Sequence, residues 1–174
     1  MIRLERIFLA LALGLFLTQA GNARAVDSFS GRVLAAHNAE RSELGLQPLV
    51  WSVSLAREAE SWALLLAREG RMRHASQLER RSHGENLWMG SAGIFSVETI
   101  IGTFLAERRH FRPGKFPDIS RTGNWKDAGH YSQVIWPRTR AVGCAMVEAK
   151  GMEYFVCRYD PGGNWIGEFV GTGH

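Results

Sequence analysis

The sequence has no hydrophobic run long enough to cross a membrane as a helix. Its longest apolar stretch covers residues 7–17, whereas a membrane-spanning helix needs about 20 apolar residues. Arg3 and Arg6 precede this stretch, and Ala23-Arg24-Ala25 follows it after a polar break. A basic start, a short apolar centre and an A-x-A site are typical of a secretory signal peptide. We therefore predict a signal peptide at residues 1–25, cleaved after Ala25, and a secreted or periplasmic protein. A buried N-terminal helix is the less favoured alternative.

A strong excess of charge of one sign is also absent. The chain carries 21 Lys and Arg residues against 17 Asp and Glu residues, and the predicted leader contains three of the former and one of the latter. Residues 26–174 therefore keep a formal net charge of only +2. Because a nucleic-acid-binding domain usually shows a basic stripe, we expect no nucleic-acid partner. The 149 residues after the leader fit one domain of common size.

Cysteine is scarce, since only Cys144 and Cys157 occur. No second pair is available to complete a four-ligand zinc site with them. In the oxidising compartment of an exported protein, a single pair can form a disulfide. Lys150-Gly151 predicts a tight hairpin turn, and the cysteines lie six residues before Lys150 and seven residues after it. They would stand almost opposite each other on paired strands, so we predict a Cys144–Cys157 disulfide.

Internal repeats and low-complexity segments are absent, so hydrophobic periodicity carries the secondary-structure prediction. Helical spacing, with Ser or Gly at the ends, predicts helices from Ser28 or Ser30 to residue 43, at 54–69 and at 96–109. Segments 71–84 and 112–128 are predicted loops. β-Branched and aromatic runs predict strands at residues 131–136, 141–148, 152–159 and 165–170. Helices first and hairpin-linked strands later favour an α+β fold with an antiparallel sheet.

Three ionisable residues stand among apolar neighbours. Glu85 lies just before Leu87, Glu107 lies on or beside the apolar face of the third helix, and His130 heads the strand predicted at 131–136. A carboxylate or imidazole held against apolar groups must be paired, or its pKa shifts. Such clusters mark ligand or metal sites. Spacing alone favours the structural alternative, with Glu107 on a solvated helix edge and His130 bonded to a backbone carbonyl.

Four short motifs, in order along the chain, carry a family resemblance. Residues 84–87 read Gly-Glu-Asn-Leu, residues 129–136 read Gly-His-Tyr-Ser-Gln-Val-Ile-Trp, and residues 155–164 read Phe-Val-Cys-Arg-Tyr-Asp-Pro-Gly-Gly-Asn. A fourth pattern, at residues 34–62, includes Leu34, His37, Asn38, Arg41, Pro48, Leu49, Trp51, Leu55, Ala56, Ala59 and Trp62. Together these motifs resemble the CAP superfamily of cysteine-rich secretory proteins, antigen 5 and plant pathogenesis-related class 1 proteins. The resemblance covers nearly all of residues 26–174, which look like a bacterial-type secreted CAP (SCP) domain.

The resemblance implies an α/β/α sandwich with a central antiparallel sheet and a cleft lined by two histidines and two glutamates. Glu85 and His130 fall on the family's motifs. Glu107 falls on the glutamate of a family helix, although Phe104 and Phe111 stand where Trp and Tyr are usual.

The second histidine of this cleft is less firmly marked. His74 occupies the segment that normally reads CxxxH, but the cysteine is missing, and His83 is a rival. The expected tetrad is therefore His74, Glu85, Glu107 and His130. The resemblance also matches Cys144 and Cys157 to one family disulfide.

Ligand binding is the first function that the resemblance implies, because relatives bind sterols, fatty acids or other lipids. We expect a small lipid or other amphiphilic ligand, a contact with a membrane surface, and a monomer. Phe111, Phe116 and Trp125 would place their rings on the apolar tail, while interspersed Arg and Lys side chains would meet an anionic head. Core or loop anchoring is the alternative role for these rings.

Metal-dependent chemistry is a second hypothesis. His74 and His130 would share a Zn²⁺ ion, and Glu85 or Glu107 would act as general base in a hydrolase. Two protein ligands are fewer than the usual three in catalytic zinc sites, and Ser132 has no evident His-Asp relay. An enzyme is therefore the less favoured interpretation. A third hypothesis is a scaffold whose surface loops bind another macromolecule.

Overall fold

The computed structural model describes residues 28–171, and the signal peptide predicted at residues 1–25 lies outside them. Within this range no helix is long and apolar enough to cross a membrane. The centre of the fold is a four-stranded sheet in the order β1-β4-β5-β2. Its strands are β1 (Val50–Trp51), β2 (Gly84–Ser91), β4 (Ala141–Ala149) and β5 (Met152–Asp160).

The three long strands of this sheet are antiparallel, and the short edge strand is not. β4 pairs antiparallel with β5, and β5 pairs antiparallel with β2. β1 pairs parallel with β4, so the central sheet is antiparallel in its three long strands, as expected, and mixed at this edge. The strands β1 and β4 are far apart in the sequence, so no hairpin turn fixes their relative direction.

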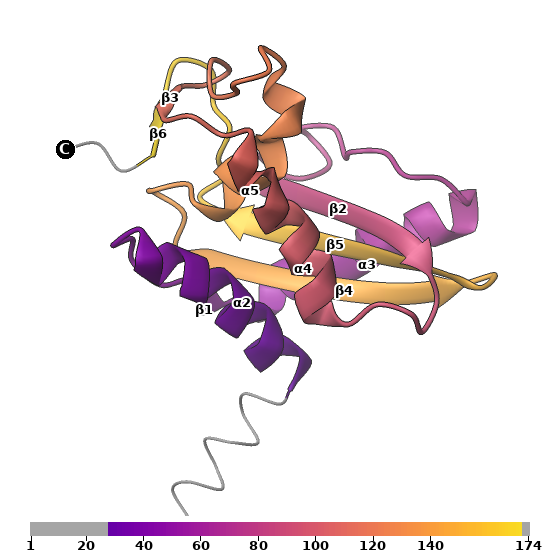
Figure 1. Cartoon of the computed structure of the whole chain (residues 1–174). Helices are drawn as coiled ribbons and strands as arrows, with labels where there is room; N and C mark the ends of the chain where they lie inside the picture. The colour runs from indigo at the N-terminus through magenta and orange to yellow at the C-terminus, as the bar shows by residue number, and fades with distance from the viewer. Residues whose placement is uncertain (1–27, 172–174) are drawn as a thin grey trace, which may run out of the picture.

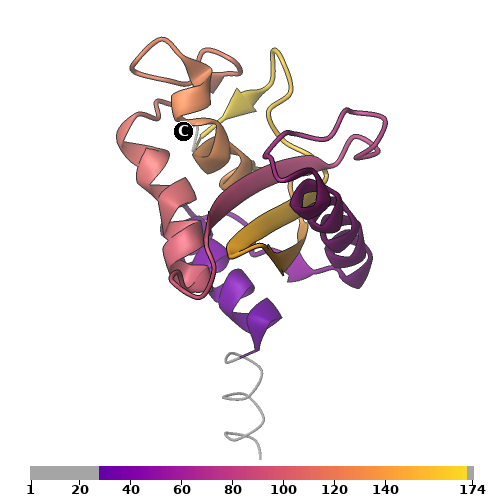
Figure 2. The same cartoon turned by 90° about the vertical axis from the view of Figure 1, so that its right-hand side faces the viewer.

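Helices cover both faces of the sheet (Figures 1 and 2). α3 (Val53–Glu69) lies on one face and forms a buried cluster with β2 and β5. α2 (Phe29–Glu43) and α4 (Val97–Ala106) lie on the other face, over a larger buried cluster that includes Phe104 and Phe155. The expected three-layer α/β/α arrangement is confirmed.

Local sequence signals set the ends of the helices. Ser28, Ser52 and Ser96 are the N-caps of α2, α3 and α4, and each hydroxyl accepts a backbone N–H from the first turn. Gly70 ends α3 in the left-handed region, with φ 66°. The third predicted helix, 96–109, is α4 followed by the 3₁₀ turn η1 (Glu107–Arg109).

The hairpin between β4 and β5 brings the two cysteines together. Lys150 and Gly151 form its turn, both with positive φ, as a type I′ turn requires. Cys144 is the direct register partner of Cys157, and the two form a disulfide with a Cα–Cα distance of 4.1 Å. The disulfide predicted from the hairpin spacing is confirmed.

The segment predicted as a strand at 131–136 is instead the helix α5 (Gly129–Val134). β-Branched and aromatic side chains favoured a strand, but Tyr131, Val134 and Ile135 also have the i, i+3, i+4 spacing of a helix face, and all three are buried. The carboxylate of Glu107 accepts the backbone N–H groups of His130 and Tyr131 at the start of α5. This long-range contact satisfies donors that a helix start leaves open.

Two further strand predictions need correction. Residues 165–170 contain only the short strand β6 (Phe169–Val170), which pairs with β3 (Gly114–Lys115) in a separate two-stranded sheet. The turn η2 (Trp125–Asp127) lies in the loop predicted at 112–128. Residues 84–91, not predicted as a strand, form the whole of β2. In the views of Figures 1 and 2, the loops around β3, β6 and η2 lie together at one end of the central sheet.

Candidate functional site

A cavity of about 810 Å³ lies at this end of the sheet, between segments that are far apart in the sequence. It is lined by the start of β2, the start of α5, and the loops before β2, around η2 and before β6. The lining residues are His74, Gln77, Arg80, Glu85, Asn86, Phe116, Trp125, Lys126, Gly129, His130, Gln133, Gly163, Asn164, Trp165 and Ile166.

One side of the cavity carries a histidine held by a buried glutamate. Nδ1 of His74 lies 2.6 Å from Oε1 of Glu85, which also accepts the backbone N–H of Ala75 at 3.1 Å. The His74 side chain is 63% exposed, whereas that of Glu85 is 1% exposed. Because a carboxylate only accepts hydrogen bonds, Nδ1 is the donor. The other ring nitrogen, Nε2, has no hydrogen-bond partner within residues 28–171.

Behind this pair lies a buried arginine that the sequence analysis did not single out. Arg158 stands opposite Glu85 in the pairing of β5 with β2, and its Nη1 lies 2.8 Å from Oε2 of Glu85. Neither atom makes an aligned hydrogen bond, so the attraction between the charges is the main link. Burial lowers the pKa of the Arg158 guanidinium, and the charge of Glu85 opposes this shift.

A second histidine–glutamate pair places its histidine at the same cavity. Nδ1 of His130 donates to Oε1 of Glu107 at 2.6 Å, while Oε2 of Glu107 accepts the backbone N–H of His130 at 2.8 Å. The His130 ring stacks on Phe104 with centroids 4.9 Å apart. Nε2 of His130 likewise has no hydrogen-bond partner in the described chain. Glu107 itself does not line the cavity; it orients His130 from behind.

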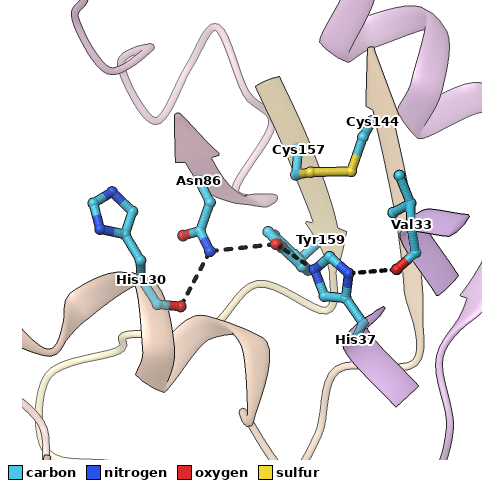
Figure 3. The surroundings of a disulfide bond; sticks show 7 residues. All are labelled: Val33, His37, Asn86, His130, Cys144, Cys157 and Tyr159. Atoms are coloured by element: carbon cyan, nitrogen blue, oxygen red, sulfur yellow. Dashed lines mark hydrogen bonds between the residues drawn. A yellow bond between two sulfur atoms is a disulfide. The ribbon is translucent and has the colours of Figure 1, made fainter. Parts of the chain in front are cut away.

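A chain of hydrogen bonds links the backbone of α5 to β2, β5 and α2 (Figure 3). The amide Nδ2 of Asn86 donates to the carbonyl of His130 at 3.1 Å and contacts the Tyr159 hydroxyl at 3.3 Å. His37 Nδ1 donates to the carbonyl of Val33 at 2.8 Å, so its Nε2 accepts from Tyr159 at 2.9 Å. In the motif at residues 84–87, Glu85 therefore bonds to the His74 ring, and Asn86 bonds to the backbone carbonyl of His130.

Burial makes His37, at the inner end of this chain of hydrogen bonds, resistant to protonation. Desolvation lowers the pKa of His37 to about 4. The hydrogen bond to the Val33 carbonyl raises this pKa, but by less than desolvation lowers it. The neutral ring is therefore the form that connects α2 to Tyr159 at neutral pH. His37 thus joins α2 to Tyr159 on β5.

Close backbone approaches shape the inner wall of the cavity. A Cβ at Gly84 would lie 2.0 Å from Oε1 of Gln133, and one at Gly163 would lie 2.7 Å from the Trp136 ring. The same Gln133 oxygen accepts the N–H of Gly163 at 2.9 Å. Glycine at both positions thus lets β2, α5 and the loop before β6 pack closely around the side-chain amide of Gln133.

Two of the three predicted ligand-loop aromatics reach the cavity. Phe116 and Trp125 both line it and pack edge to face with centroids 5.2 Å apart. Phe111 does not: it is only 9% exposed and packs on Tyr131 with centroids 5.2 Å apart. Phe111 is therefore part of the core. Trp165 and Ile166, which the sequence analysis did not name as ligand contacts, complete the apolar side.

The rival histidine and the serine lie elsewhere. Nδ1 of His83 lies 2.9 Å from Oε2 of Glu58, and His83 does not line the cavity. The hydroxyl of Ser132 is buried and within 2.6 Å of Oδ1 of Asn164, which holds the loop before β6. Within residues 28–171, no group of three or more His, Cys, Asp or Glu side chains is arranged to hold a metal ion.

Fold and site together define a class of protein: a disulfide-linked α/β/α domain with two histidine–glutamate pairs beside one aromatic-walled cavity. Residues 34–159 match the CAP family model, described as the cysteine-rich secretory protein family. The chain belongs to this family, and the resemblance seen in its motifs is confirmed.

Relatives and solved structures agree with this assignment. Pathogenesis-related protein 1A of Nicotiana tabacum is 32% identical over 167 residues, which cover 95% of this chain and 94% of that protein. The crystal structure of NaASP2 with Zn²⁺ matches with a TM-score of 0.70 at 22% identity, covering 84% of this chain and 87% of that one. Hookworm platelet inhibitor matches with a TM-score of 0.64 at 17% identity, covering 82% and 74%. At these identities the two structures establish the fold alone.

Proposed function

We propose that this protein is an exported binding protein that holds a small amphiphilic ligand, such as a fatty acid, in the cavity beside His74 and His130. One observation carries the proposal: a single cavity is lined both by aromatic side chains and by two imidazoles with free Nε2 atoms. An apolar tail would contact Phe116, Trp125 and Trp165, and a polar head would meet the imidazoles.

The size and charge of the cavity support this ligand class. A volume of about 810 Å³ lies within the range of about 300–1,000 Å³ typical of small-molecule sites. Arg80 and Lys126 also line the cavity, and Lys126 forms no ion pair among the described residues. An anionic head is therefore favoured over a neutral one.

Fluorescence titration with a dansyl-labelled fatty acid tests the proposal, with the corresponding fatty alcohol as a neutral comparison. Trp125→Ala should weaken binding by about tenfold, because it removes one large apolar contact. Lys126→Gln should weaken binding of the acid more than that of the alcohol. Phe95→Ala is a matched control, since Phe95 and Trp125 are both 39% exposed and Phe95 does not line the cavity. Equal affinity of all four proteins would overturn the proposal.

A divalent cation such as Zn²⁺ is a second candidate ligand. In many zinc sites each ligating histidine donates its other ring nitrogen to a carboxylate, and both His74 and His130 do so at 2.6 Å. Two imidazoles are one ligand short of the usual three. The donor set therefore fits a weak site, completed by water or by the bound ligand. A bound ion would supply positive charge for an anionic head, and the two glutamates would keep the imidazoles oriented.

Calorimetric titration with ZnCl₂ separates this candidate from adventitious binding. His74→Asn and His130→Asn should each abolish the same heat of binding. His83→Asn is the matched control, because His83 is also paired with a glutamate but lies outside the cavity. Zinc binding that survives both cavity substitutions, or disappears with His83→Asn, would exclude the His74–His130 site.

A further inference from the structure

Two of the loops that border the cavity carry the most exposed large apolar side chains of the described residues. Leu78 is 89% exposed and Ile166 is 84% exposed. Ile166 lines the cavity, and Leu78 lies between Gln77 and Arg80, which both line it. Their two loops therefore border one cavity, although they are more than eighty residues apart in the sequence.

A third loop contributes an interfacial aromatic side chain. Trp125 lines the same cavity and is 39% exposed. In Figure 2 the loop after α3, the loop before β6 and the segment around η2 rise together above the end of the sheet. Single exposed apolar residues are ordinary on protein surfaces. Three of them around one opening, each on a different loop, form a surface patch that the packing of the core does not require.

Basic side chains are interleaved with this patch. The loop segments 76–83, 112–128 and 161–168 contain six Lys and Arg residues and four Asp and Glu residues. Two of the four carboxylates are already paired, Glu168 with Arg138 and Asp118 with Arg112. The other two, Glu79 and Asp127, accept hydrogen bonds from their own loops. Lys115 and Lys126 have no ion-pair partner among residues 28–171, so the end of the molecule that holds the mouth favours an anionic surface.

We propose that these three loops dock the cavity mouth onto an anionic lipid bilayer. Leu78, Trp125 and Ile166 would enter the interface between headgroups and acyl chains, and the nearby Arg and Lys side chains would meet the lipid phosphates. Exposed apolar side chains on loops that also carry Lys and Arg suit a bilayer, which has an apolar interior beneath an anionic surface. The inference rests on the proposed function, because it makes an anionic bilayer the source of the ligand that the cavity holds.

Co-sedimentation of the mature protein with vesicles tests this docking. Vesicles of phosphatidylglycerol mixed with phosphatidylcholine are compared with vesicles of phosphatidylcholine alone. The wild-type protein should prefer the anionic vesicles and lose affinity at high salt. Leu78→Gln and Ile166→Gln should each lower the partition coefficient by about tenfold, because each removes an inserted aliphatic group. Ile94→Gln should not, since Ile94 is 69% exposed but lies in the turn after β2, at the far end of that strand from the cavity.

The result that overturns the docking surface is equal vesicle binding by the wild type and by Leu78→Gln and Ile166→Gln, or no vesicle binding at all. The docking surface would also be overturned, in favour of a protein partner, if the wild-type protein bound a membrane protein but did not bind the vesicles. The dansyl fatty acid assay reports on the cavity separately. Because Leu78 does not line the cavity, Leu78→Gln should bind vesicles more weakly and keep fatty acid binding. If the wild-type protein did not bind the fatty acid, the proposed function would be overturned instead.

Discussion

Arg158 and Glu85 face each other across strands β5 and β2, with 2.8 Å between Nη1 and Oε2 and with side chains only 2% and 1% exposed. The other oxygen of Glu85 holds His74. A buried charge without its partner is strongly destabilising, whereas loss of both partners is tolerated far better. Arg158 therefore makes it possible for a charged glutamate to hold a cavity histidine from inside the sheet.

Replacing Arg158 by Met should lower the free energy of unfolding by about 3–5 kcal/mol, because it leaves the carboxylate of Glu85 buried and unpaired. Urea unfolding checks this value. The double variant with Glu85→Gln should be less destabilised than the sum of the two single variants. Additive effects would mean that the two charges do not depend on each other.

Stability should fall on acidification through the burial of His37. The pKa of His37 is lowered from 6.5 to about 4 in the folded protein, so the unfolded chain binds this proton first. The contribution is complete above pH 6.5 and is lost as the pH falls towards 4, by about 3 kcal/mol in all. Urea unfolding from pH 7 to pH 5 should show this slope, and His37→Gln should flatten it. NMR titration of the His37 ring offers an independent check, and a midpoint near 6.5 would refute the buried neutral state.

The Cys144–Cys157 disulfide should contribute about 3 kcal/mol to stability, since it closes a loop with a sequence separation of 13 residues. The variant with Ala at both positions should still fold, because the β4–β5 pairing extends on both sides of the disulfide. Thermal unfolding measures the loss. Addition of a reducing agent should change the melting temperature of the wild-type protein but not that of the variant.

Glu107 should matter for stability as well as for the orientation of His130. Its carboxylate accepts from the His130 ring and from two backbone N–H groups at the start of α5. Glu107→Ala should destabilise the fold by about 2 kcal/mol, because these donors lose their acceptor. Glu107→Gln keeps one oxygen and should lose less. Glu60→Ala, on the exposed side of α3, should leave thermal stability almost unchanged; an effect as large as that of Glu107→Ala would argue against the α5 contact.

Features decided by nearby residues could be predicted from the sequence. Gly70 marks the end of α3, and the Lys150-Gly151 turn sets the register that joins the two cysteines. α5 could not be predicted in this way, because the donors at its start are satisfied by Glu107 from another element. Its apolar residues fit a strand and a helix equally well.

In the candidate site, too, features set by nearby residues could be predicted and features set by distant residues could not. The family motifs pointed to Glu85 and His130. They favoured His74 over His83 less firmly, because the cysteine of the usual CxxxH segment is missing. Their partners, Glu85 and Glu58, decide which one faces the cavity. A signal for Arg158 was present: a charged residue inside an otherwise apolar strand requires a buried counter-charge.

The central claim is that one cavity, between His74 and His130, holds the ligand. Amide and imidazole NMR spectra of a protein comprising residues 26–174, recorded during titration with lauric acid, test it most directly. The account predicts that the largest shifts fall on His74, Trp125 and Gln133, with small shifts on α2 and at Ile94. Shifts that concentrate on α2 and α4, or that spread evenly over the surface, would contradict it.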